Sequence, residues 1–69
     1  MIKNYPEPNR IYKSSNGGLF KVLFLSINTE TEEILVNYQS ILFGTYFSTS
    51  LEFWNSTDNG VIRFLLVKN

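Results

Sequence analysis

Carboxylates are the first residues to consider for acid–base or metal chemistry in this sequence, because it contains no histidine and no cysteine. Zinc and iron–sulfur sites depend on those two residue types and are therefore not expected. Glu30, Glu32 and Glu33 crowd one predicted turn, but they lack the number and spacing of ligands found in a calcium loop. General acid–base catalysis without histidine needs two carboxylates held in one pocket, and no such pair is indicated. We interpret the acidic cluster as a solvated turn and predict no metal site.

The sequence also contains no pattern that indicates a catalytic nucleophile or a phosphate-binding loop. Serines are plentiful, yet no histidine or suitably placed lysine is available to activate one. Gly17-Gly18 is an isolated diglycine, whereas a phosphate-binding loop needs a longer glycine pattern that opens a helix. The sequence therefore predicts a protein that is not an enzyme and has no cofactor.

Binding by aromatic and cationic side chains is the remaining chemistry. Tyrosine and tryptophan dominate the energetic hot spots of protein interfaces, and they also stack on nucleic-acid bases. Arg63 lies within a predicted strand, where it either extends to solvent or anchors a carboxylate or a phosphate. The candidate binding residues are Tyr12, Tyr38, Tyr46, Trp54 and Arg63.

The elements that must position these residues are short β-strands. Runs of β-branched and aromatic residues are separated by clusters of glycine, asparagine and serine, which is typical of a compact all-β domain. Ser50 is placed to cap a single helical turn before the last strand, and Asn59-Gly60 is a strong turn signal. The predicted strands are residues 11–13, 19–27, 34–42, 45–48 and 61–67.

Alternation along the longest strand predicts which side chains share a face. Phe20, Val22 and Phe24 fall on one face, which we expect to be the core. The opposite face carries more apolar residues than a solvated surface should, namely Leu23, Leu25 and Ile27. Either strand curvature and the N-terminal arm or loops cover these three, or they form an exposed interface with a second copy or a partner.

Length and charge limit the organisation and the partners. Sixty-nine residues predict a single domain, with an extended N-terminal arm at residues 1–10 and a folded part at 11–69. The arm either frays or lies across the domain with Tyr5 as its anchor. A net charge of zero argues against a nucleic-acid arm or a polybasic membrane patch. With no apparent signal peptide and no membrane-spanning run, we expect a cytoplasmic protein.

Several blocks resemble a small bacterial and phage family, the domain-of-unknown-function family sixteen-fifty-three. They are Tyr12-Lys13-Ser14, GGLFKV at 17–22, NTETEEILVNYQ at 28–39, LEFW at 51–54 and GVIRF at 60–64. The resemblance implies a five-stranded SH3-like β-barrel with no established activity. The family's histidines fall on Ser14 and Asn28, its lysine on Asn16, and its arginine–proline pair on Thr49 and Ser50. A binding site made by those cationic groups would be lost here.

Three functions follow as hypotheses. The first is a non-catalytic module that binds another protein, with a phage-encoded modulator of a host or defence protein as a specific case. The second is a module that binds or sequesters nucleotides or single-stranded nucleic acid by aromatic stacking, with Lys21 and Arg63 on the phosphates. The third is a structural homo-oligomer formed through Leu23, Leu25 and Ile27.

Overall fold

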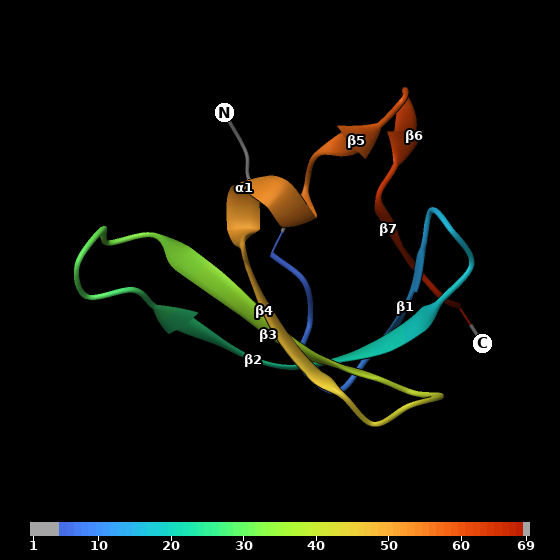
Figure 1. Ribbon diagram of the computed structural model, residues 1–69, viewed down its shortest axis with the longest axis horizontal. Helices are drawn as coiled ribbons and strands as arrows, with labels where there is room; N and C mark the ends of the chain where they lie inside the picture. The colour runs from blue at the N-terminus through green and yellow to red at the C-terminus, as the bar shows by residue number, and fades with distance from the viewer. Residues whose placement is uncertain (1–4, 69) are drawn as a thin grey trace.

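The computed structural model describes residues 5–68, which form a mainly β structure around one antiparallel sheet (Figure 1). The strand order in this five-stranded sheet is β4-β3-β2-β1-β7, so consecutive strands are neighbours except for the last. Its strands are β1 (Ile11–Ser14), β2 (Leu19–Ile27), β3 (Ile34–Ser40), β4 (Tyr46–Ser50) and β7 (Phe64–Leu66). A short helix, α1 (Leu51–Trp54), follows β4, and β5 (Thr57–Asp58) and β6 (Val61–Ile62) form a separate two-stranded hairpin. No helix among residues 5–68 is long and apolar enough to cross a membrane.

The predicted all-β class is confirmed, but the expected closed barrel is not seen. Within the described residues the sheet is open, with β4 at one edge and β7 at the other. The strand predicted at 61–67 is broken at Arg63. Its first half, β6, pairs with β5, and only β7 returns to pair with β1. Only the three residues of β7 therefore join the main sheet. They pair with β1 and do not reach β4, so the sheet stays open.

A β-bulge in β2 changes which side chains face the core. Val22 pairs with Tyr38, but Phe24 pairs with Asn37, so one extra residue, Leu23, lies between them. After the bulge the alternation is reversed, and Leu25 lies opposite Val36. The predicted grouping of Phe24 with the core face is therefore wrong. Leu25 packs against the core, whereas Phe24 is exposed.

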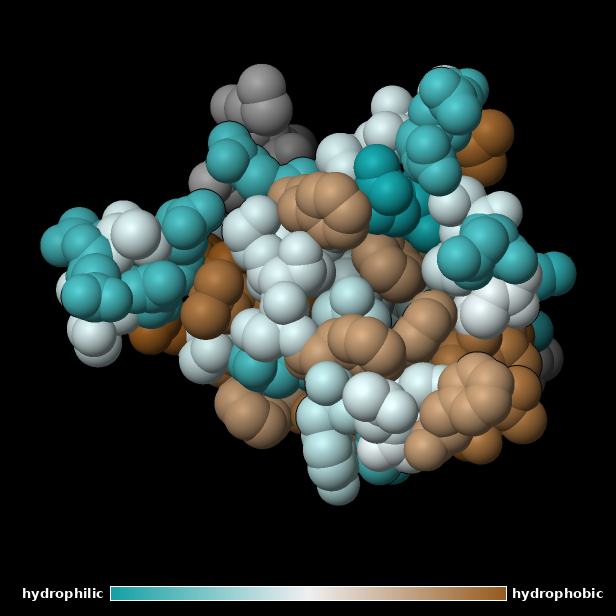
Figure 2. Space-filling view, viewed as in Figure 1, coloured by the Kyte–Doolittle hydropathy of each residue, from teal (hydrophilic) through white to brown (hydrophobic). Residues whose placement is uncertain are grey.

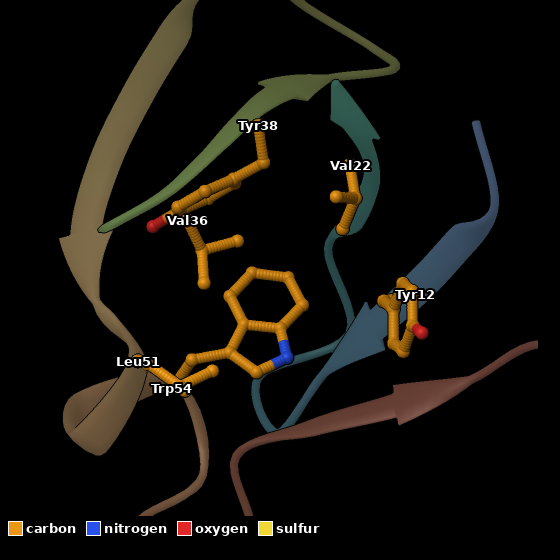
Figure 3. Packing of buried hydrophobic residues seen from close by; sticks show 6 residues of the cluster. All are labelled: Tyr12, Val22, Val36, Tyr38, Leu51 and Trp54. Atoms are coloured by element: carbon orange, nitrogen blue, oxygen red, sulfur yellow. The ribbon is translucent and has the colours of Figure 1, made fainter. Parts of the chain in front are cut away.

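Trp54 lies in the middle of the core, surrounded by side chains from three strands (Figure 3). Its indole makes edge-on contacts with Tyr12 and Tyr38, at centroid distances of 5.4 and 5.1 Å. Aromatic rings bury large areas and prefer such geometry, which allows a short chain to build a core without disulfides. The buried apolar residues are Tyr12, Val22, Val36, Tyr38, Leu51 and Trp54.

Two local signals act as the sequence predicts. The Ser50 hydroxyl accepts a hydrogen bond from the backbone N–H of Phe53 at 3.1 Å and so caps α1. Asn59 and Gly60 both have positive φ, 53° and 82°, in the turn between β5 and β6.

The described part of the N-terminal arm packs on the sheet. Pro6 is buried, and Tyr5, the predicted anchor, is 53% exposed. The backbone N–H of Asn9 donates to the carbonyl of Val22, and the N–H of Val22 donates to the carbonyl of Arg10. Residues 7–10 form a turn, so the arm is not extended throughout. Residues 1–4 of the predicted arm lie outside the described residues.

Candidate functional site

Three of the predicted binding aromatics belong to the core. Tyr12, Tyr38 and Trp54 are only 8%, 9% and 3% exposed. The Tyr12 hydroxyl accepts a hydrogen bond from the backbone N–H of Glu7, which ties the arm to β1. Burial raises the pKa of Tyr38 above its ordinary value, because the apolar surroundings disfavour the phenolate. These rings leave little surface on which a partner or a base could stack.

Arg63 is engaged by its own chain. Its Nε donates to the Ser56 hydroxyl at 3.0 Å, and Nη2 donates to the Thr57 carbonyl at 3.3 Å. Its guanidinium carbon lies 4.2 Å from the centre of the Phe53 ring, in a cation–π contact. Arg63 thus ties the end of α1 to the β5–β6 hairpin, which is a third outcome beside the two that the sequence suggested.

The bulge in β2 separates Leu23 from the other two predicted interface residues, Leu25 and Ile27, which share a face. Leu23 lies at the bulge, Leu25 packs on the core, and Ile27, at the end of the strand, is 61% exposed. Leu25, Ile27 and Ile34 line a shallow hollow together with Tyr5. Contact between any of these residues and a partner stays a prediction.

An apolar cleft lies at the end of the sheet where the β1–β2 and β3–β4 turns meet. Its volume is about 750 Å³. Phe20 and Phe47 contribute from the core face of the sheet, with their rings edge to face at 5.9 Å. We define the apolar cleft by its lining residues, which are residues 16–18, Leu19, Phe20, Ser40, Ile41, Leu42, Phe43 and Phe47.

Leu42 and Phe43 are the most exposed apolar residues of this cleft, at 81% and 80%. Hydrogen bonds fix the turn that carries them. Ser40 is buried, its hydroxyl accepts from the N–H of Phe43 at 3.1 Å, and its carbonyl accepts from the N–H of Gly44 at 2.9 Å. The Gln39 side-chain amide donates to the Gly44 carbonyl at 3.0 Å. Two large apolar side chains are therefore held in solvent by a turn that these hydrogen bonds fix.

The cleft carries no ionisable side chain among its lining residues. In Figure 2, apolar side chains gather over the end of the β3–β4 hairpin, at lower right, while polar side chains cover the opposite end of the molecule. Such an environment favours apolar contacts over ionic ones. Elsewhere in residues 5–68, no three acidic side chains are arranged to hold a metal ion.

None of the five predicted binding residues lines this cleft. The buried ring of Tyr38 contacts two of its lining residues, Phe20 and Phe47, each at 5.4 Å, and Tyr46 is 71% exposed on β4 next to Phe47. The sequence predicts that residues 41 and 42 end a strand, whereas in the structure they begin the turn. One signal was present: Ile41-Leu42-Phe43 is an apolar triplet directly before a glycine with positive φ, where turns usually carry polar residues.

No family model, curated protein or solved structure matches this chain.

Proposed function

We propose that this protein is a non-catalytic binding module that binds another protein through the apolar cleft. The observation that carries the proposal is the exposure of Leu42 and Phe43, at 81% and 80%, on a turn fixed by hydrogen bonds. Burial of a leucine or phenylalanine side chain is worth about 1.5–3 kcal/mol. A partner that covers both residues gains that energy without first ordering the loop, which lowers the entropic cost of binding.

The chemistry of the cleft favours a protein over a nucleotide or a nucleic acid. Lysine and arginine supply much of the affinity for nucleic-acid phosphates, and the lining of the cleft has neither. Arg63, which the nucleotide hypothesis would use, is bonded to Ser56 and Thr57. The apolar, aromatic lining instead suits the leucine, phenylalanine or tryptophan side chains that anchor protein interfaces.

The finer identity of the protein is part of this proposal. The resemblance of residues 12–64 supports membership of the domain-of-unknown-function family sixteen-fifty-three and an SH3-like arrangement of strands. The sequential antiparallel order of β1 to β4, followed by a helical turn before the last strand, is compatible with both. We extend the proposal to a phage-encoded modulator that binds a host or defence protein in the host cytoplasm.

Affinity capture with paired variants tests the binding proposal. The cleft variant is Leu42→Asp with Phe43→Asp. The control is Val61→Asp with Ile62→Asp, an equally adjacent apolar pair that is 55% and 57% exposed on the β5–β6 hairpin. A protein captured by the wild type would be purified, and its Kd measured with all three forms at low and high salt.

The expected result is binding that is weakened at least about tenfold by the cleft variant, unchanged by the control, and little affected by salt. Two results would contradict the proposal. One is a captured protein whose affinity is the same for the cleft variant and the wild type. The other is steeply salt-dependent binding of nucleotide or single-stranded nucleic acid with no protein partner.

A further inference from the structure

Strand β4 is a sheet edge that lacks the usual protection against pairing. Its five residues are Tyr46-Phe47-Ser48-Thr49-Ser50, with no proline and no charge, and its register with β3 is regular throughout. Among the described residues, β3 is its only neighbour in the sheet. Natural edge strands usually carry a lysine, a proline or a bulge that prevents another strand from adding. An edge without any of these is open to a further strand.

The hydrogen-bond pattern shows which backbone groups point outward from β4. The N–H of Ser40 donates to the carbonyl of Thr45 at 2.9 Å, which fixes the phase of the antiparallel ladder. With this phase, Phe47 bonds to Tyr38 and Thr49 bonds to Val36 in the register observed. The backbone N–H and C=O groups of the alternate residues, Tyr46 and Ser48, are therefore directed away from β3.

We infer that a second copy of this chain pairs with β4 through its own β4, antiparallel, on a two-fold axis at Ser48. In this register the two Ser48 residues exchange both backbone hydrogen bonds, and Tyr46 of each copy lies opposite Ser50 of the other. Phe47 lies opposite Thr49 of the other copy. Each cross-strand pair therefore joins an aromatic residue to a serine or threonine, or a serine to a serine. No pair brings two like charges or two large rings against each other. The five-residue edge is thus complementary to itself.

Charge and area also fit a second copy. Identical copies repel when their shared surface is charged, but β4 has no charged residue and the chain has a net charge of zero. Phe43, Tyr46 and Phe47, on and beside this edge, are 80%, 71% and 43% exposed. Together they expose roughly 400 Å² of aromatic surface, about half of the ~800 Å² that each partner contributes to a standard interface. The backbone of the edge and its remaining side chains add to that area. Closed two-fold dimers are the commonest oligomers, and this pairing joins two sheets into one.

Sedimentation equilibrium of the full chain, from micromolar to near-millimolar concentration, tests the inference. The wild type is expected to approach twice its monomer mass of 8.0 kDa. Ser48 is exposed, so Ser48→Lys and Ser48→Glu leave the core intact, as far-UV circular dichroism would verify. On a two-fold axis, each substitution places like charges against each other and should raise the dimer Kd at least about tenfold. An equal mixture of the two variants should form a heterodimer, because the charges then attract.

Leu65→Lys is the matched control, since it adds the same charge to β7, the opposite edge strand, at a residue that is 58% exposed. This variant should dimerise like the wild type. A wild type that stays monomeric at the highest concentration would overturn the inference, as would a Ser48→Lys variant that dimerises normally or a mixture that stays monomeric. The second copy and the cleft partner both cover Phe43 and Phe47 and therefore compete. A protein that binds the monomeric Ser48→Lys variant at least as tightly as the wild type would leave the proposed function standing, whether or not the wild type dimerises.

Discussion

The indole of Trp54 stacks on the ring of Phe64, with centroids 3.9 Å apart and planes only 5° apart. Trp54 ends α1, and Phe64 begins β7, so this contact joins the helical turn to the last strand of the sheet. Phe64 also meets Phe20 and Tyr38 edge-on, at 6.0 and 5.6 Å. A strand of only three residues is thus held by aromatic packing as well as by its ladder with β1.

Phe64→Ala should therefore cost about 3 kcal/mol in the free energy of unfolding, because it removes a ring from three aromatic contacts and leaves a cavity. That is a large part of the roughly 3–10 kcal/mol expected for a chain of this length. Phe24→Ala is the control, since Phe24 is 55% exposed and should lose less than about 1 kcal/mol. Urea unfolding followed by far-UV circular dichroism measures both. Equal losses would contradict the role assigned to Phe64.

The two arginines of the sequence offer a matched test of the contact between α1 and the β5–β6 hairpin. Arg63→Lys should destabilise the fold by about 1–2 kcal/mol, because lysine cannot bond to Ser56 and Thr57 together while lying over Phe53. Arg10→Lys should change stability by less than about 0.5 kcal/mol, since the Arg10 side chain forms an exposed ion pair with Glu7 at 3.6 Å that lysine can replace. Thermal and urea unfolding compare the two variants. An Arg63→Lys variant as stable as the wild type would show that this contact does not hold the hairpin.

Alkaline pH should destabilise the protein through Tyr38. The pKa of this phenol is raised in the folded state by burial, so the folded chain keeps a proton that the unfolded chain loses near pH 10. The stabilising effect is complete below the unfolded pKa and is lost as pH rises through the folded pKa. Tyr38→Phe should therefore flatten the fall in unfolding free energy above about pH 10. Tyr46→Phe, at an exposed tyrosine, should retain the fall, and an identical pH profile for the wild type and Tyr38→Phe would refute the assignment.

Local chemistry in the sequence predicted much of the fold because it acts over a few residues. The serine cap on α1 and the Asn59-Gly60 turn depend on one side chain or one pair of dihedral angles, and both were recognised. Local sequence signals do not predict that the last strand is interrupted at Arg63. The interruption depends on partners in α1 and β5, which meet Arg63 only once the chain has folded.

The candidate site was largely missed for a related reason. Amphipathic aromatics serve both cores and interfaces, and residue type alone does not separate the two uses. Tyr12, Tyr38 and Trp54 were attractive binding candidates, but a chain this short needs them for its core. Leu42 and Phe43 look like core residues, yet they lie in a turn and are exposed.

The bulge at Leu23 is the feature that simple alternation could not supply, and one pair of substitutions tests it directly. Strict alternation places Phe24 inside and Leu25 outside, whereas the observed register places Leu25 opposite Val36 and against the core. Leu25→Lys should therefore destabilise the fold by about 2–4 kcal/mol, because it puts an ammonium group against an apolar cluster. Phe24→Lys, at the adjacent exposed position, should cost less than about 1 kcal/mol. Urea unfolding of the two variants decides between the registers: a larger loss for Phe24→Lys would restore strict alternation and remove the bulge.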